Sequence, residues 1–157
     1  MTPKKITALA ALGLFALLSA VVTPTLVQAV TVDSSIASMS NDQLIAARKA
    51  AMKENEKLLR KAESLIGDEA VAAATTLLQN FTNFPALFKE GSGEGNTKAK
   101  AEIWTNWADF KGRFAADAAA AANMLKGAKD GDDDLYFSAI QDMGNSCNGC
   151  HRQYKGF

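Results

Sequence analysis

The chain has 157 residues, with 17 basic and 17 acidic side chains and one histidine. Its start differs from the rest: a short basic segment, an apolar stretch over residues 6–22 and the small-residue sequence Val27-Gln28-Ala29 follow one another. This order is typical of a secretory signal peptide over residues 1–29. Its removal leaves one domain, residues 30–157, with a net charge of −2, and a surface so close to neutral excludes a charge-driven nucleic-acid binder.

The alternative for residues 6–22 is a membrane anchor that is retained, because a mostly apolar segment of 17 residues is close to the shortest length that crosses a bilayer. The small residues that follow favour cleavage. We therefore expect an exported protein with no membrane span after cleavage.

The composition of residues 30–157 favours helices, because alanine is frequent and Pro85 is the only proline. The capping box Ser40-Asn41-Asp42-Gln43 predicts a first helix that ends near Ile66. A second, shorter helix is expected over residues 68–83, since the residue before a proline disfavours helical geometry.

A loop is expected at the glycine-rich residues 91–96. The third helix should then cover about residues 98–125 and end at Gly127. The acidic residues 130–134 predict a turn and the start of a fourth helix that reaches about Tyr154, because the helix dipole favours negative charge at that end. Four amphipathic helices predict an all-α fold, an antiparallel four-helix bundle.

The chemistry is concentrated in one motif. Both cysteines and the only histidine fall within Cys147-Asn148-Gly149-Cys150-His151. C-x-x-C-H is the motif of covalent haem attachment, in which each thiol adds to a vinyl group of the porphyrin and the histidine binds the iron. We therefore expect one covalently bound haem c on Cys147 and Cys150, with His151 as a metal ligand.

Three alternatives fit the motif less well. A structural zinc site needs four ligands, and two cysteines with one histidine supply three. A thioredoxin-like dithiol stands at the start of a helix in a βαβ unit, whereas this motif lies near the end of a predicted helix. A plain disulfide would close a very short loop and stabilise the fold little.

A single C-x-x-C-H motif near the C-terminus of an exported four-helix chain resembles the class II cytochromes c, the cytochrome c' family. The resemblance includes Arg48, Met52, Glu102-Ile103-Trp104 and Gly144-Asn145-Ser146-Cys147. Ala101 departs from it, because relatives often have proline there, which leaves the start of the third helix open. The resemblance implies a covalent haem in a helical bundle, and it suggests a homodimer through the first two helices.

Met52 is the residue that separates two functions. It belongs to a stripe of the first helix expected to face the interior: Ile45, Arg48, Met52, Asn55, Leu59, Ala62 and Ile66. In the family this position is a non-ligating residue in the five-coordinate proteins and a coordinating methionine in the low-spin ones. The Arg-Lys-Ala-Ala-Met spacing resembles the low-spin group, so Met52 is predicted as the second iron ligand; the alternative is core packing. Weaker ligand candidates are Met39, Met124 and Met143.

Two cations are candidate cofactor-binding residues. An arginine on an interior stripe needs an anion, so Arg48 is predicted to pair with a haem propionate, and Lys98 is a second candidate. The alternative for Arg48 is an exposed helix surface. An apolar wall beside the porphyrin is expected from Trp104, Trp107, Phe110, Phe114 and Phe137.

The resulting hypothesis is a monohaem electron carrier in the periplasm that exchanges electrons with redox partner proteins. No further set of acid, base and nucleophile stands out, so we expect no enzymatic activity. The alternative function is a five-coordinate cytochrome c' that binds nitric oxide or another diatomic gas. Four cations are expected either to ring the haem edge for an acidic partner or to be solvated helix ends: Lys126, Lys129, Arg152 and Lys155.

Overall fold

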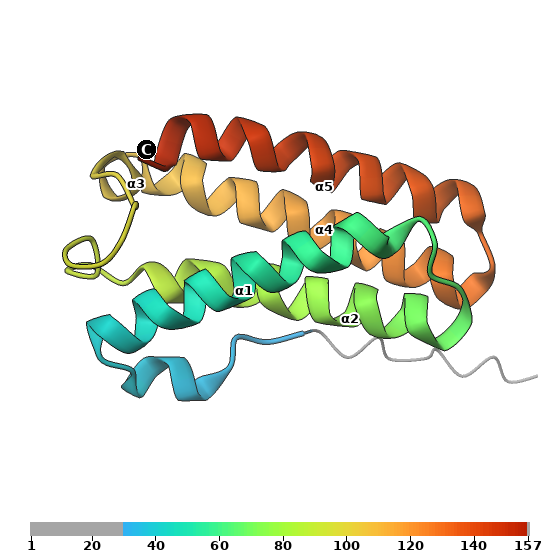
Figure 1. Cartoon of the computed structure of the whole chain (residues 1–157), viewed down its shortest axis with the longest axis horizontal. Coiled ribbons are helices and arrows are strands. Elements are labelled where there is room, and N and C mark those ends of the chain that lie inside the picture. Colours follow the sequence, from blue (N-terminus) through green and yellow to red (C-terminus); the bar gives the residue numbers. More distant parts are fainter. Residues whose placement is uncertain (1–29, 157) are drawn as a thin grey trace, which may run out of the picture.

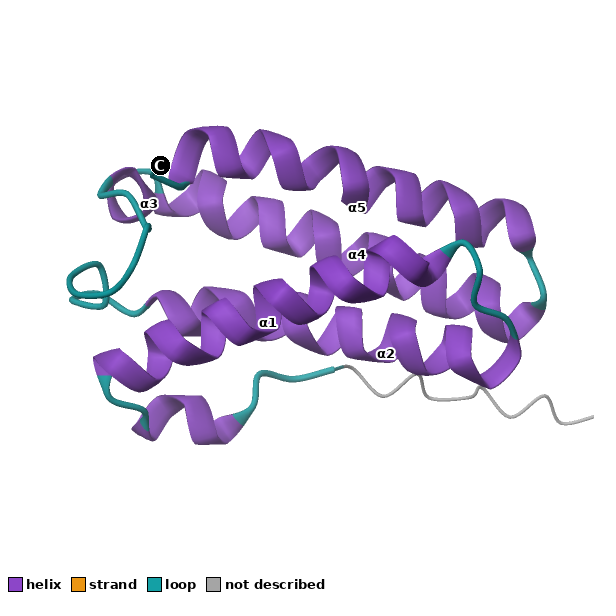
Figure 2. Cartoon of the chain, viewed as in Figure 1, coloured by secondary structure: helices purple, strands orange, loops and turns teal. Residues whose placement is uncertain are grey.

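The computed structural model describes residues 30–156. The predicted signal peptide, residues 1–29, lies outside this part of the chain. The long helices run side by side and are joined by short connections at one end and by a longer loop at the other (Figures 1 and 2). The long helices are α1 (Asn41–Ala62), α2 (Gly67–Asn83), α4 (Trp107–Asp130) and α5 (Asp133–Tyr154). The short ones are η1 (Ser34–Ser38), η2 (Phe84–Phe88) and α3 (Glu102–Thr105).

The start of α1 confirms the predicted capping box. The Ser40 hydroxyl accepts a hydrogen bond from the Gln43 backbone N–H at 3.3 Å, and the Gln43 side chain accepts one from the Ser40 N–H at 2.8 Å. The predicted end was wrong, because α1 stops at Ala62. Ile66 has extended backbone and an 82% exposed side chain, so it does not belong to the buried stripe.

The third predicted helix is divided in two. Asn106 leaves helical geometry (φ −113°, ψ 39°) and separates α3 from α4. Gly127 does not end α4, which continues to Asp130 and is capped by Gly131 at φ 68°. A side chain at position 127 would meet the backbone of Tyr136 at 2.7 Å, so glycine allows α4 and α5 to approach here.

The start of α5 agrees with its acidic sequence. The Asp132 carboxylate accepts a hydrogen bond from the Leu135 N–H at 3.0 Å, and Asp133 and Asp134 occupy the first turn. Negative charge there is stabilised by the exposed N–H groups of the helix.

The helices pack unevenly. α4 lies along both α2 and α5, whereas α1 lies against α2 and η2 and approaches α5 at few points. Aromatic rings fill the interior: Phe84 stacks on Phe114 at 4.8 Å between centroids, and Phe110 meets Phe88 at 4.8 Å and Tyr154 at 5.0 Å. The all-α four-helix bundle is confirmed. Within residues 30–156, no helix combines the length and apolarity needed to cross a membrane.

Candidate haem site

The attachment motif lies in the last turns of α5. A spacing of three residues places Cys147 and Cys150 on the same side of the helix. Cys150 is 9% exposed, Cys147 is partly buried, and both are free thiols. The next residue, His151, is exposed. Two neighbouring thiols and an adjacent imidazole therefore occupy one end of the bundle.

The environment of the two thiols does not suit a thioredoxin-like dithiol. Burial raises the pKa of Cys150 to about 11, with the positive charge of Arg113 opposing and the negative charge of Asp117 adding to the shift. Burial and Asp117 also raise the pKa of Cys147. Redox-active cysteines have lowered pKa values, because the thiolate is the reactive form. Nor do three or more His, Cys, Asp or Glu side chains gather as a set of metal ligands within residues 30–156.

Glu56 of α1 lies near His151 and Lys155 at the end of α5. The hydrogen bond and charge of Arg60 lower the pKa of Glu56 most, and the nearby Lys155 and His151 add smaller contributions in the same direction. Although His151 is exposed overall, partial burial of its imidazole and the charge of Lys155 lower its pKa, and Glu56 opposes this. Met52 lies one turn before Glu56, is partly buried and packs against the core. Met52 therefore lies one turn from Glu56, the α1 residue whose carboxylate is near His151 of α5.

Arg48 is buried, with only 3% of its surface exposed, so the alternative of an exposed helix arginine was wrong. Its guanidinium donates to the Ser92 hydroxyl at 3.0 Å, the Ser92 carbonyl at 2.8 Å, the Thr97 hydroxyl at 2.7 Å and the Leu87 carbonyl at 3.4 Å. It also stacks over the Phe88 ring at 4.5 Å. These acceptors are all neutral, and burial lowers the pKa of Arg48. A buried cation in this setting is stabilised by a nearby anion, which a propionate would supply.

Ser92 and Thr97 are hydrogen-bond partners of Arg48 that the sequence did not reveal. Ser92 is completely buried, although it lies in a glycine-rich segment that reads as an exposed loop. The sequence signal that could have identified them is that two hydroxyl residues lie in and directly after this segment. Hydroxyl oxygens can accept hydrogen bonds from a buried arginine.

Lys98 reaches the same end of the bundle through its backbone. Its carbonyl accepts a hydrogen bond from the Gly156 N–H at 2.7 Å, and the neighbouring Ala99 forms an isolated β-bridge with Lys155. The Lys98 side chain is exposed. Its contact with a propionate stays a prediction.

The residues present fit a haem c. The thiol pair and imidazole supply the attachment and one ligand, and α1 adds an unsatisfied donor. Asn55 is 5% exposed; its Oδ1 accepts from Asn80 at 2.7 Å, but its Nδ2 has no hydrogen-bond partner among the described residues. A buried N–H without a partner costs about 1–3 kcal/mol, so a polar group of a bound cofactor would relieve this cost.

Two predictions about the surroundings of the site need correction. Phe110 and Phe114 are buried and Trp104 and Trp107 are partly buried, but Phe137 is 40% exposed and is not part of an apolar wall. The four cations do not form one ring, because α4 and α5 are antiparallel and each pair ends a different helix (Figure 1). Lys126 and Lys129 lie roughly 30 Å from Arg152 and Lys155, about the length of α5.

A four-helix bundle with C-x-x-C-H on its last helix defines a c-type cytochrome of the helical class. Residues 43–155 match the family model described as Cytochrome C'. Cytochrome c-556 from Agrobacterium tumefaciens is 39% identical over 88 residues, which cover 55% of this chain and 70% of that protein. Cytochrome c' from Pararhodospirillum photometricum is 30% identical over 96 residues, covering 60% and 77%.

The fold is also similar to that of solved structures. Cytochrome c prime from Shewanella frigidimarina superposes with a TM-score of 0.68 at 26% identity, covering 75% of this chain and 98% of that one. The chain belongs to the cytochrome c' family, and its cofactor is one covalently bound haem c. This confirms the class II resemblance and the predicted cofactor.

Proposed function

We propose that the protein is a monohaem electron carrier of the periplasm, in which His151 and Met52 bind the iron from opposite sides. The haem supplies an iron that alternates between the ferric and ferrous states. Cys147 and Cys150 hold the cofactor, and a thioether opposite an imidazole raises the reduction potential. The same two ligands serve both oxidation states, so little rearrangement accompanies electron transfer.

The observation that carries this proposal is the placement of Met52. Met52 is partly buried against the core and lies one turn from Glu56, whose carboxylate is near His151 of α5. A thioether at this place is a suitable ligand, because methionine binds haem iron opposite histidine in electron-transfer cytochromes. Arg48 would offset the charge of a propionate, and the buried aromatic side chains would help to exclude water from a bound porphyrin.

The proposal also covers the localisation, the partners and the oligomeric state of the protein. Residues 1–29 resemble a signal peptide, which supports export to the periplasm. Partner redox proteins would accept and donate the electron, and no substrate would be converted, so the protein is proposed not to be an enzyme. A homodimer is proposed as well, because a solved cytochrome c' of similar fold has a dimer whose dissociation is controlled by ligand.

A second candidate is binding of a diatomic gas at an iron that Met52 does not coordinate. The names of the relatives favour this candidate over the first, because several are cytochromes c'. The cytochrome c' of Alcaligenes xylosoxidans, whose fold is similar, has been solved as nitric oxide complexes of two variants. In this case Met52 would be an apolar neighbour of the gas and not a ligand.

An absorption spectrum of the oxidised protein separates the two candidates. The electron-carrier proposal predicts a low-spin spectrum with a methionine-to-iron charge-transfer band, and it predicts loss of that band with a change to high spin in Met52→Ala. Met124→Leu is the control, because Met124 is fully buried in the core and should not affect the band. A high-spin wild type whose spectrum Met52→Ala leaves unchanged would contradict the carrier and favour the gas-binding protein.

A further inference from the structure

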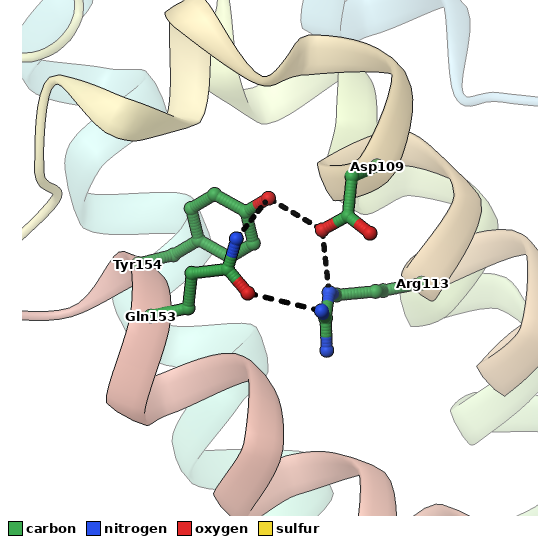
Figure 3. Close-up of polar contacts among 4 residues, drawn as sticks. All are labelled: Asp109, Arg113, Gln153 and Tyr154. Atoms are coloured by element: carbon green, nitrogen blue, oxygen red, sulfur yellow. Dashed lines mark hydrogen bonds and ion pairs between the residues drawn. The ribbon is translucent and has the colours of Figure 1, made fainter.

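A closed ring of polar contacts joins the start of α4 to the end of α5 (Figure 3). Tyr154 donates its hydroxyl to Asp109 Oδ2 at 2.5 Å, and Arg113 Nε donates to the same oxygen at 2.8 Å. Arg113 Nη2 donates to Gln153 Oε1 at 3.0 Å, and Gln153 Nε2 donates to the Tyr154 hydroxyl oxygen at 3.1 Å. Each of these four residues, which we call the polar ring, therefore contacts two others.

The charges in the polar ring agree with its hydrogen bonds. The bonds from Arg113 and Tyr154 lower the pKa of Asp109, and Asp109 in turn raises the pKa of Arg113. Asp109 is thus an ionised double acceptor at neutral pH, and Arg113 a charged double donor. An isolated exposed ion pair contributes little, but a network of several groups holds its geometry more firmly.

Backbone hydrogen bonds also hold the last turn of α5, which carries Gln153 and Tyr154. The Tyr154 carbonyl accepts from the Lys100 N–H at 3.0 Å, and the Gly156 N–H donates to the Lys98 carbonyl at 2.7 Å. The Tyr154 ring is 3% exposed and meets the edge of Phe110. The last turn of α5 is therefore fixed from two sides.

His151 lies in this turn, two residues before Gln153 and three before Tyr154. Its ring makes no hydrogen bond to another residue within 30–156, so no neighbouring side chain in this part of the chain orients it directly. Its backbone carbonyl accepts the Lys155 N–H at 3.1 Å, which belongs to the same turn. The backbone position of His151 is consequently set by the position of the turn.

We propose that the polar ring of Asp109, Arg113, Gln153 and Tyr154 positions His151 as the proximal iron ligand. The proposal rests on the proposed function in one respect, namely that His151 binds the iron. These residues are positioning residues, because they act through the helix turn and do not touch the iron. A firmly held turn would keep the His151 imidazole in one place in both oxidation states, which would favour rapid electron exchange.

The test compares two tyrosines of the same helix. Tyr154→Phe removes the hydroxyl from the polar ring, while Tyr136→Phe removes a hydroxyl that donates to the Ala62 carbonyl at 2.9 Å at the other end of α5. Both tyrosines are buried, and both variants keep the aromatic ring that packs in the core. Each variant should lower the melting temperature, so stability alone does not distinguish them.

The distinguishing measurement is the iron–histidine stretching band in resonance Raman spectra of the ferrous holoprotein. It is recorded in a Met52→Ala background, where the iron is five-coordinate. Tyr154→Phe should shift the band to lower frequency and broaden it, and Tyr136→Phe should leave it unchanged. The reduction potential, measured with Met52 present, should rise in Tyr154→Phe only, because a weaker imidazole bond stabilises the ferric iron less.

A double variant tests whether the polar ring acts as a unit. Asp109→Ala removes the shared acceptor, so Asp109→Ala combined with Tyr154→Phe should shift the band no further than the larger single change. Equal bands in Tyr154→Phe, Tyr136→Phe and the parent would overturn the positioning role. A band that persists in His151→Gly would instead contradict the ligand assignment, and with it the proposed function.

Discussion

Arg48 connects the loop before α3 to the proposed haem pocket. Four hydrogen bonds from its guanidinium hold η2 and the segment up to Thr97, and the same side chain lies one turn before Met52. Its charge and its geometry therefore have separate consequences. The planar donor set organises the loop, and the charge favours an anion in the pocket.

Replacing Arg48 should destabilise the protein through the loop. Arg48→Leu leaves the buried Ser92 and its neighbours without a donor, so we expect the free energy of unfolding to fall by about 3 kcal/mol. Lys49→Leu is the matched control, since Lys49 is exposed and reaches only Asn96 in the same loop. Denaturant titration and hydrogen exchange over residues 92–97 measure both effects. Equal stabilities of the two variants would contradict the buried role of Arg48.

His151 has a role that is separable from haem attachment. His151→Gly keeps both cysteines, so covalent attachment should persist while the iron loses its imidazole. We expect a changed absorption spectrum, and partial recovery when imidazole is added, because the free ligand occupies the vacated position. A wild-type spectrum without added imidazole would show that another group binds the iron.

Asp117 makes stability depend on pH. Burial raises the pKa of this carboxyl, although a hydrogen bond with Ser146 and the charge of Arg113 oppose the shift. A raised pKa in the folded state means that stability is highest below the unfolded pKa, about 3.9, and falls as the pH rises towards the folded value. Asp117→Asn should therefore be more stable than the parent at pH 7, with a gap that closes below pH 4. Thermal melts across this range measure it, and a gap independent of pH would count against the assignment.

The helices themselves were predictable where a local pattern determines them. The capping box at Ser40 and the acidic start of α5 depend on residues within one turn, and both are found in the structure. The C-x-x-C-H motif is equally local, since its chemistry is contained in five consecutive residues. These features needed no knowledge of the rest of the fold.

Other features depend on contacts between distant segments, which periodicity does not report. Ile66 continued the apolar stripe of α1 in the sequence, but the helix ended one turn earlier and left it exposed. Gly127 read as a helix end, although it is the point where α4 and α5 touch. Ser92 read as loop surface, because its partner Arg48 lies 44 residues away.

Two glycines of α4 should respond oppositely to the same substitution. Gly127→Ala places a Cβ 2.7 Å from the Tyr136 nitrogen and 2.8 Å from the Asp132 carbonyl, so the helices must separate and about 1–3 kcal/mol of stability should be lost. Gly112→Ala meets nothing within 4 Å and should stabilise the exposed helix surface by about 0.5–1 kcal/mol. Urea unfolding of both holoproteins measures the difference. The same sign in both variants would contradict the close approach of α4 and α5.

At the scale of the whole molecule, the bundle is built around its cofactor. α1 approaches α5 at few points, and the buried Asn55 Nδ2 lacks a partner in the described residues. Haem attachment and folding should therefore be linked. Cys147→Ser and Cys150→Ser should each yield less covalent haem and less folded protein, as measured by circular dichroism and purification yield. Fully folded, haem-free protein at normal yield would show that the haem is not part of the core.

The central claim is that this chain carries one haem c through Cys147 and Cys150. Its most direct test is the intact mass of the denatured mature protein, together with its pyridine haemochrome spectrum. We predict a mass increase of one haem per chain and the spectrum of a haem with two thioether bonds, both absent in the double variant Cys147→Ser/Cys150→Ser. A denatured chain with the mass of the polypeptide alone and two free thiols, after expression with an active haem-attachment system, would contradict the account.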